Sequence, residues 1–428
     1  MKIALSLCVL ATWSGLAQAQ NTDSIARRTR AADSARVQRT LDSLTAVVRA
    51  LQARLDTTAQ SKDTAAGGDE LAAIRAAAAA ASGPDTAPPA QATPRLGQNA
   101  LNPEISVTGD LRGNVRSPGP QTDNFLPREF EVGFQSALDP FSTAKVFISA
   151  GPEGFDLEEG YAYFTALPGH LRLDVGKFRQ QIGELNRWHL HALPEDEYPL
   201  VIRRFAGDEG LAATGVSLYW PLPLATFGGA YEFTAQATTG ENDILYAGGR
   251  RPAVNAQIAG FWQMSRATYA QLSLSGLYGT NPDTSLTTQL GVVAARFSWR
   301  PPQEAQAREL TLRGELWSLH RNFDFTFVTP GGGVIGPYDA TRLGGYVDGT
   351  WKLNRRWTFS TRGDYVQSPD LTVDAHEWAV TPSLTFWQSE FVFIRGAYEH
   401  ARDLVDANRD RFTMQLVFAM GPHKHELF

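Results

Sequence analysis

Apolar and polar residues alternate with a period of two from about residue 102 to the end of the chain. The alternation falls into about sixteen segments of roughly 8–13 residues, none with the 3.6-residue period of a helix. This pattern predicts an all-β domain over residues 102–428. The expected strands are 104–112, 128–138, 143–150, 159–167, 171–178, 213–220, 227–237, 255–264, 268–278, 289–299, 309–319, 343–353, 357–366, 376–387, 390–400 and 411–420.

The connections between these segments alternate strictly between short turns and long loops. Turns such as "PGH" and "NRR" contrast with the long stretches 113–127 and 320–342. Sorting of this kind is typical of an antiparallel barrel that crosses an outer membrane, and a soluble sandwich has no reason to show it. We therefore expect a transmembrane β-barrel of about 16 strands, with apolar positions facing lipid and polar positions facing the lumen.

Aromatic residues gather at the strand ends that border the short turns. An interfacial girdle of amphipathic rings would need them there, although aromatic residues also favour strands in general. The bias towards strand ends favours the girdle. Its members would be Tyr219, Trp220, Trp299, Trp351, Trp357, Phe386 and Trp387.

The first residues are typical of a secretory signal. Lys2 precedes a short apolar core, and Ala17-Gln18-Ala19 forms a small-x-small cleavage site, so we expect a signal peptide over residues 1–19. A lipid anchor on Cys8 is the alternative, but the bulky Leu7 precedes it. Because Cys8 is the only cysteine, the mature chain would have neither a disulfide nor a thiolate metal site.

Residues 20–66 are predicted to form a coiled-coil helix, followed by an Ala/Pro-rich linker over 67–101. The helix would carry an apolar seam along one side, and a single helix cannot bury such a seam. We therefore expect self-association, with a lone helix as the alternative. The apolar a/d seam consists of Val37, Leu41, Leu44, Val48, Leu51 and Leu55.

Composition narrows the class of partner. The formal net charge of −6 disfavours nucleic acid, and no apolar run after residue 16 is long enough for a membrane helix. The expected partners are outer-membrane lipid and small solutes.

The third long connection, residues 179–212, is the longest and contains, from Ile182 to Phe205, nine large apolar residues that a freely solvated loop would not need. We expect it to fold into the barrel and narrow it; covering the rim or a subunit contact is the alternative. Its charges would form a constriction whose transverse field sieves polar solutes. The candidate constriction residues are Arg179, Arg187, Arg203, Arg204, Glu195, Asp196, Glu197, Asp208 and Glu209.

Three pairs of opposite charges stand two residues apart on the polar faces of strands. We expect them to line the lumen wall; the alternative is that the two charges of a pair neutralise each other and only stiffen the wall. The pairs are Arg172 with Asp174, Arg313 with Glu315, and Arg362 with Asp364.

Two histidine pairs are candidate metal ligands, because paired imidazoles bind zinc or copper. His189 with His191, and His423 with His425, would each lie on one side of an extended chain, but neither has an evident third ligand nearby in sequence. We expect no metal and no cofactor. No G-x-S-x-G motif occurs, which argues against an enzyme, although membrane hydrolases do not require that motif.

The chain resembles porins, in particular the phosphate-selective porins O and P. The likeness rests on the coiled-coil start, the linker, the barrel, the ending "GPHKHELF" and the segment "VGKFRQQIG" (175–183), which resembles the strand entering a pore-narrowing loop. The resemblance implies a homotrimer. A phosphate channel should contain a ladder of arginines or lysines, whereas the expected lumen charges here are mixed, and Arg203-Arg204 is the remaining candidate anion site.

These features together predict an outer-membrane porin of a Gram-negative-type bacterium, with its N-terminal helix in the periplasm. Small polar or ionic solutes, anions such as phosphate among them, would diffuse passively through a mixed-charge constriction. The alternatives are a structural tether that uses the periplasmic coiled coil, and a barrel-type membrane hydrolase.

Overall fold

The computed structural model describes residues 103–421, except 120–124, 153, 225, 247–250, 282–284, 324–326, 329–333, 336–337, 370–373 and 406. The expected signal peptide, coiled coil and linker lie outside the described residues. So do the His423–His425 pair and the C-terminal phenylalanine.

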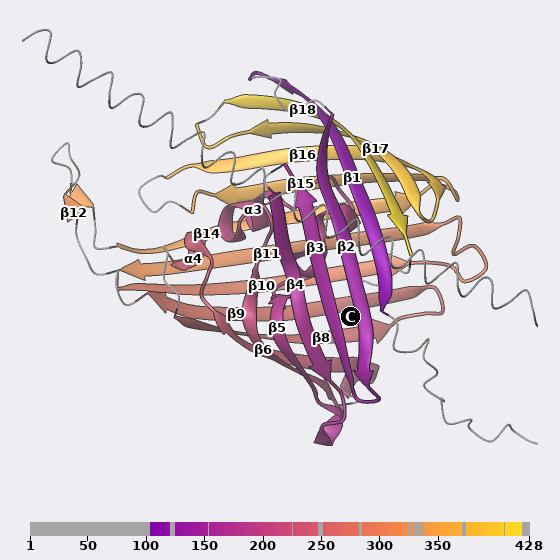
Figure 1. The fold of residues 1–428 in the computed structure, drawn as a ribbon. Helices are drawn as coiled ribbons and strands as arrows, with labels where there is room; N and C mark the ends of the chain where they lie inside the picture. Colours follow the sequence, from indigo (N-terminus) through magenta and orange to yellow (C-terminus); the bar gives the residue numbers. More distant parts are fainter. Residues whose placement is uncertain are drawn as a thin grey trace, which may run out of the picture. The chain divides into compact units, whose positions relative to one another are not determined.

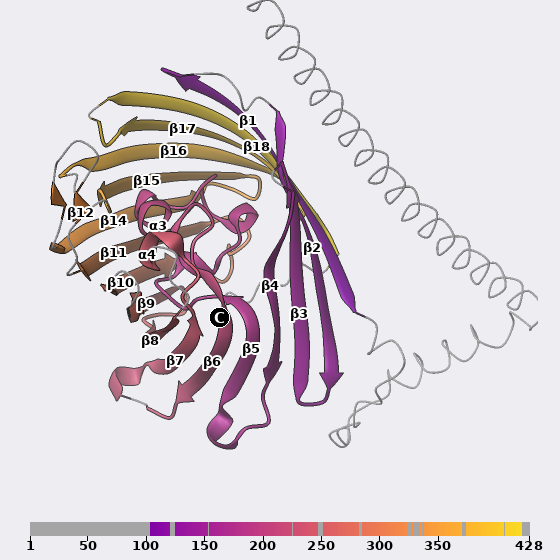
Figure 2. The same cartoon turned by 60° about the vertical axis from the view of Figure 1, so that its left-hand side comes forward.

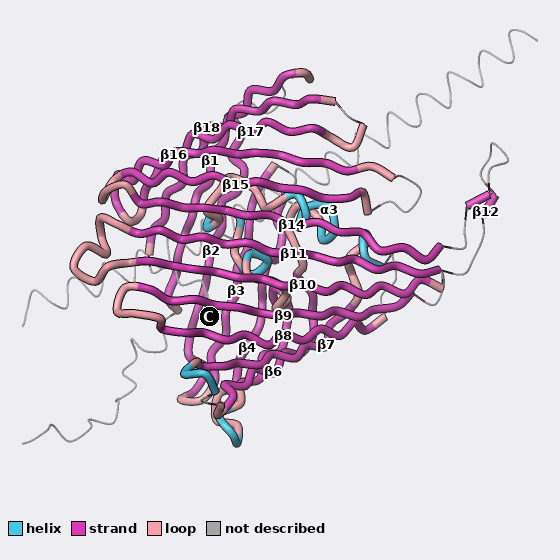
Figure 3. The backbone as a smooth tube through the Cα atoms, turned by 180° about the vertical axis from the view of Figure 1, so that it is seen from behind, coloured by secondary structure: helices cyan, strands magenta, loops and turns pink. Residues whose placement is uncertain are grey.

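Sixteen strands form one closed barrel in which neighbours along the chain pair antiparallel and the last strand pairs with the first (Figures 1 and 3). This confirms the predicted fold class. The barrel strands are β1 (Glu104–Ser117), β2 (Leu126–Asp139), β3 (Ser142–Gly151), β4 (Gly154–Phe164), β5 (Arg172–Arg179), β6 (Ala212–Leu222), β7 (Ala230–Thr239), β8 (Pro252–Gln263), β9 (Thr268–Asn281), β10 (Leu286–Trp299), β11 (Glu309–Phe323), β14 (Tyr338–Lys352), β15 (Trp357–Gln367), β16 (His376–Ser389), β17 (Val392–Arg402) and β18 (Asn408–Met420).

A small hairpin, β12 (Phe327–Val328) with β13 (Val334–Ile335), lies in the connection between β11 and β14. Within the described residues the helices are α3 (Leu200–Ala206) and α4 (Asp243–Tyr246), with single 3₁₀ turns at Pro168–His170, Leu185–Arg187, Leu190–Ala192 and Thr226–Gly228. None of the helices in the described part of the chain is long and apolar enough to cross a membrane.

The period-two pattern places apolar residues outside and polar residues inside. Along β9, for example, Leu272 and Leu274 are exposed on the outer face, while Ser273 and Ser275 are buried on the inner face. Successive side chains of a strand point to opposite faces, so this register is fixed by which face meets an apolar solvent. The outer surface is therefore suited to lipid and the interior to water and polar groups.

The predicted strict alternation of turn lengths is wrong at the end that carries the long loops. β3 and β4 are joined there by residues 152–153 alone, and β9 and β10 by 282–285. The strands extend beyond the segments that the pattern marked, so part of the expected loop length is strand. The opposite end carries short turns such as 140–141 and 390–391.

Two residues of the predicted aromatic girdle face inward. The Tyr219 hydroxyl donates a hydrogen bond to Glu232 on the inner wall, and Trp387 Nε1 donates to the inward-facing Thr358. Trp220, Trp351 and Trp357 are exposed at the ends that border the short turns, as the girdle requires. The regular alternation is the reason: Tyr219 and Trp387 are each adjacent to another girdle candidate, Trp220 and Phe386, and adjacent residues of a strand point to opposite faces.

Candidate functional site

The connection between β5 and β6, residues 180–211, lies inside the barrel (Figure 2). It carries two 3₁₀ turns and the helix α3, which contacts the inner faces of β14, β15 and β16. The helix α3 also contacts α4, which lies in the β7–β8 connection. The helices therefore occupy the part of the lumen next to β9–β16.

Apolar side chains of this loop pack against apolar side chains of the barrel wall. Phe205, Val201 and Ile202 of α3 are fully buried against residues of neighbouring strands. These strand positions face inward, where a water-filled barrel would carry polar residues, so this part of the wall is apolar on both faces. The wall residues of the cluster are Ala253, Leu277, Leu290, Val292, Trp317, Leu319, Tyr346, Val366, Ala379 and Ala401.

Glu315 of β11 fixes the start of the loop. Its Oε1 accepts hydrogen bonds from the backbone amides of Glu184 (2.8 Å) and Leu185 (3.0 Å), and from the Tyr346 hydroxyl (2.8 Å). Its Oε2 accepts one from Trp317 Nε1 at 2.7 Å. Gly183 has a positive φ of 61°, and a Cβ there would lie 2.2 Å from Glu315 Oε2, so only glycine allows this approach.

Other wall charges hold the backbone of the loop further along. Asp364 accepts a hydrogen bond from the amide of Leu200 at the start of α3, so the wall satisfies one of the helix's unpaired amides. Arg362 donates to the Glu197 carbonyl oxygen at 2.8 Å, and Arg395 donates to that of Leu193 at 3.1 Å. These side chains act as anchors for the loop.

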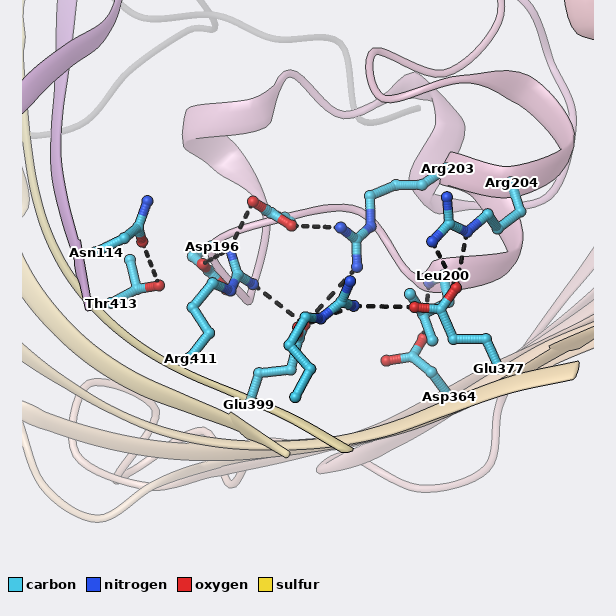
Figure 4. Close-up of polar contacts among 12 residues, drawn as sticks. Asn114, Asp196, Leu200, Arg203, Arg204, Asp364, Glu377, Glu399, Arg411 and Thr413 are labelled. Carbon is cyan, nitrogen blue, oxygen red and sulfur yellow. Dashed lines mark hydrogen bonds and ion pairs between the residues drawn. The ribbon is translucent and has the colours of Figure 1, made fainter. Parts of the chain in front are cut away.

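Charged side chains of the loop join a network with β1, β16, β17 and β18 (Figure 4). The Glu197 carboxylate accepts from Arg112 at 2.7 Å, from Arg203 at 2.6 Å and from Arg411 at 2.6 Å. Burial would raise the pKa of Glu197, but Arg411, Arg203 and Arg112 hold that pKa well below its usual range. Arg204 pairs with the buried Glu377 at 2.6 Å.

Glu195 stands apart, because burial raises its pKa to about 7 against the opposing charges of Arg362 and Arg395. Its side chain is completely covered. Its carboxyl group therefore changes charge near neutral pH inside the contact between loop and wall.

Two β-bulges place extra charges on the opposite part of the wall. In β2, Asp110 pairs with Glu129 and Leu111 with Pro127, so Arg128 is the extra residue. In β4, Phe147 pairs with Glu159 and Ile148 with Leu157, so Glu158 is the extra residue. A bulge redirects side chains, and here two consecutive charged residues turn inward on each strand instead of one.

His189 of the loop lies buried among these acids. Its Nδ1 is 2.6 Å from Glu131 Oε2 and 2.9 Å from Glu158 Oε2, and its Nε2 is 3.4 Å from Glu159 Oε1. Burial and Arg179 lower the pKa of His189, but Glu131 and Glu158 outweigh them and raise it well above its ordinary value. His191 Nδ1 lies 3.5 Å from Glu129 Oε1.

Two polar cavities adjoin this cluster. One, of about 140 Å³, is lined by Arg172, Asp174, Glu159 and His189 among others. The second, of about 860 Å³, is lined by Arg112, Arg128, Glu129 and Glu158 among others. Arg179 lines both cavities, so the cluster around it forms the partition between them.

The predicted site residues divide between the cavities and the loop's contact with the wall. Six of the candidate constriction residues line a cavity: Arg179, Arg187, Glu197, Arg203, Asp208 and Glu209. Glu195, Asp196 and Arg204 are not among the cavity-lining residues and contact the wall instead. Of the wall pairs, Arg172 and Asp174 line a cavity and bond each other at 2.7 Å. Arg313, Glu315, Arg362 and Asp364 lie against the loop.

Sequence reasoning missed Glu129, Glu158 and Glu159. Glu129 shares the polar face of β2 with Glu131, so the alternation could have found it. Glu158 and Glu159 are adjacent, and period two assigns adjacent residues to opposite faces, so only the bulge brings both inward. No third ligand lies near His189 in the sequence, and the acids around it come from strands far away in the chain, so only the fold brings them to it.

Comparisons with known proteins bear on the fold. An anion-selective porin from Comamonas acidovorans superposes with a TM-score of 0.51 at 11% identity, covering 74% of this chain and 100% of that one. The outer membrane channel DcaP of Acinetobacter baumannii superposes with a TM-score of 0.51 at 11% identity, covering 74% of this chain and 98% of that one. The trimer form of OmpT from Vibrio cholerae superposes with a TM-score of 0.50 at 9% identity, covering 74% of this chain and 100% of that one.

Sequence comparison adds a relative but no function. A protein of Aquifex aeolicus described as uncharacterized is 26% identical in an alignment of 338 positions that covers 70% of this chain and 69% of that protein. No family model matches the chain. The likeness is one of fold: the chain has the closed 16-strand barrel of outer-membrane porins.

Proposed function

We propose that this protein is an outer-membrane channel through which small polar or ionic solutes diffuse passively. The observation that carries the proposal is the division of the lumen. The loop 180–211 packs against one part of the wall, and two polar cavities that share Arg179 remain next to the other part. A solute crossing the barrel would pass from one cavity to the other at that residue.

The narrow part of the path would be lined by both signs of charge. Arg179, Arg187 and Arg203 would stand with Glu197, Asp208 and Glu209 as the constriction residues, and Arg172 with Asp174 on the wall below. Mixed charges of this kind orient polar solutes without holding them tightly.

Anions such as phosphate are among the solutes we propose. The larger cavity is rich in arginine, which favours anions, and phosphate is a good partner for guanidinium groups. The acids that line it include Glu129, Glu158 and Glu197, which offset this preference. We therefore propose weak rather than strong anion selectivity, and a likeness to the phosphate-selective porins O and P in architecture more than in charge.

The assembly we propose is a homotrimer in the outer membrane of a Gram-negative-type bacterium, with the N-terminal helix in the periplasm. The apolar outer face of the barrel supports the location. The predicted heptad seam supports self-association, and one solved barrel of similar fold, OmpT of Vibrio cholerae, is described as a trimer.

The experiment is single-channel recording of the refolded mature chain in a planar bilayer, with the reversal potential measured under a KCl gradient. The proposal expects conductance steps in groups of three and a modest preference for anions. Strong anion selectivity that phosphate blocks would make the channel phosphate-specific and put Arg203 and Arg204 first for mutation. A well-folded barrel without conductance would overturn the proposal.

A further inference from the structure

The partition between the two cavities contains a group of ligand atoms suited to a metal ion. His189 Nδ1, a Glu131 oxygen and a Glu158 oxygen all lie within 4.8 Å of one another, and all three residues are in the buried interior. They come from the loop, β2 and β4, so the folded barrel alone brings them together.

The spacing of these atoms is close to that of a coordination shell. Zinc binds imidazole nitrogen and carboxylate oxygen at about 2.0–2.2 Å, so neighbouring ligands of a tetrahedral site are about 3.4 Å apart. The two oxygens lie 2.6 Å and 2.9 Å from Nδ1. Each would have to move outward by roughly half an ångström or slightly more to admit an ion, which glutamate side chains permit.

A second, independent feature is the partner on the far side of the imidazole ring. Glu159 Oε1 lies 3.4 Å from His189 Nε2, the nitrogen that points away from the other two acids. Metal-binding histidines usually donate their second ring N–H to a carboxylate, which fixes the tautomer and raises the basicity of the ligand nitrogen. Glu159 and His189 thus supply the carboxylate and the histidine of a carboxylate–histidine–metal arrangement, with Nδ1 as the ligand atom.

The charge balance also favours a dication. Glu129, Glu131, Glu158 and Glu159 approach His189 and His191, so four carboxylates gather here; Arg179, which lies 2.8 Å from Glu158, is one of the positive charges beside them. Arg179 is held as well by the Tyr198 hydroxyl and the Glu209 carbonyl oxygen, so it keeps its place when Glu158 turns towards an ion. Buried acids in excess of cations are costly unless a further positive charge joins them.

We propose that His189, Glu131 and Glu158 bind a divalent transition-metal ion of the zinc class, with Glu159 as the outer partner of the imidazole. Mixed imidazole and carboxylate donors suit zinc and its neighbours better than magnesium or calcium. Glu129 and His191 form a neighbouring group that shares Glu131. An ion at this position stands in the partition, so it would reduce the flow of solutes; that consequence rests on the proposed channel function, whereas metal binding does not.

The test is calorimetric titration of the refolded full chain with Zn²⁺, together with Co²⁺ titration followed by visible absorption. The proposal expects saturable binding and Co²⁺ bands typical of nitrogen and oxygen ligands. His189→Gln and, separately, Glu131→Gln should each weaken Zn²⁺ binding by more than the roughly 10- to 100-fold that loss of an outer partner costs. Glu159→Gln should cost about that amount.

His400→Gln is the matched control. On the side of the strand that faces away from the lumen, His400 Nδ1 lies 2.7 Å from Asp410 Oδ1. The variant therefore removes a histidine–carboxylate pair outside the proposed site and should leave the affinity for Zn²⁺ unchanged. Heat-modifiable mobility of the barrel on gels shows that each variant has folded. Wild-type protein that does not bind Zn²⁺, or binding that survives His189→Gln and Glu131→Gln alike, would overturn the proposal and leave the cluster as an ion-pair network only.

Conductance separates this proposal from the channel function. Micromolar Zn²⁺ should lower the conductance of the wild type and of His400→Gln, but not that of His189→Gln. A barrel that binds Zn²⁺ but never conducts would contradict the channel and leave the metal site standing. A channel that conducts but neither binds nor responds to Zn²⁺ would contradict the metal site alone.

Discussion

Two parts of the barrel wall, β8–β17 and β1–β6, differ in the side chains that they present to the lumen. Along β8–β17 a cluster of apolar inward side chains packs against the loop, and charged residues such as Glu315 and Asp364 bond to the loop backbone. Along β1–β6 several inward positions are charged, two bulges add further charges, and the cavities lie beside them. One part holds the loop, and the other forms the path beside it.

The contrast explains why the same residue types do different work in one barrel. Arg172 and Asp174 face a cavity and bond each other, whereas Arg362 and Asp364, with the same spacing, also bond the loop backbone. An ion pair covered by the loop contributes to docking, since its partners are desolvated. A pair in the cavity is screened by water and acts on solutes instead.

Loss of Glu315 should have the largest effect on this arrangement. In Glu315→Ala, the amides of Glu184 and Leu185 and the side chains of Trp317 and Tyr346 lose their acceptor, and each buried orphan costs about 1–3 kcal/mol. We expect the loop to leave the wall and single-channel conductance to rise several-fold. Glu304→Ala, in an exposed turn where the residue pairs only with Arg308, is the control. Unchanged conductance in folded Glu315→Ala would show that this anchor does not hold the loop.

Removal of one apolar anchor should weaken docking without opening the barrel. Phe205→Ala removes a fully buried ring, and such truncations cost about 3–5 kcal/mol. Because the strands keep their hydrogen bonds, the loss should be local, and we expect faster proteolytic cleavage within 180–211 with the barrel intact. Phe227→Ala, in an exposed turn, should have no such effect. Equal protease resistance in the two variants would argue against the apolar contact.

Glu195 should make loop docking depend on pH. Burial in the docked loop raises the pKa of Glu195 from 4.5 to about 7, so the carboxyl group ionises less readily there than in a solvated loop. The docked state therefore loses stability as the pH rises from 4.5 to about 7, and above that range the loss is complete. Glu195→Gln should therefore match the wild type at pH 4 and be more stable at pH 8, by on the order of 3 kcal/mol at most. Protease resistance of the loop at both pH values measures this. A wild-type pH dependence that persists in Glu195→Gln would place its cause elsewhere.

The smallest expected effect concerns ion selectivity. Arg203 lines the larger cavity but is already paired with Glu197, so Arg203→Gln should move the reversal potential only slightly towards cations, less than about twofold in permeability ratio. Arg308→Gln, in an exposed turn, is the matched control and should leave the potential unchanged. A large shift in Arg203→Gln would mean that this arginine acts on solutes as an unpaired charge.

The strands could be predicted from sequence because one property, the side of the sheet, repeats every second residue. The sixteen segments and the position of the longest loop follow from that period. Period two could not tell that Leu290 and Val292 face inward, in one apolar cluster with side chains of the loop, since an apolar residue on the inner face breaks the rule for barrels.

The arrangement of the site was less predictable for a related reason. Bulges at Arg128 and Glu158 change which face a residue occupies, and a one-residue slip leaves no mark in composition. The contacts of Glu197 with Arg112 and Arg411 join residues far apart in the chain, which only closure of the barrel brings together. A list of loop charges therefore could not separate those that line cavities from those that anchor the loop.

The most direct test of the divided lumen compares two single cysteines in the chain from residue 20 onward, which has none of its own. Ser217 and Ser275 are both buried on the inner face, but Ser217 lines a cavity whereas Ser275 bonds the amide of Gly183 beneath the loop. A charged, water-soluble thiol reagent should lower the conductance of Ser217→Cys and leave Ser275→Cys unaffected. Equal block of both channels, or block of Ser275→Cys alone, would contradict a path that runs beside the loop.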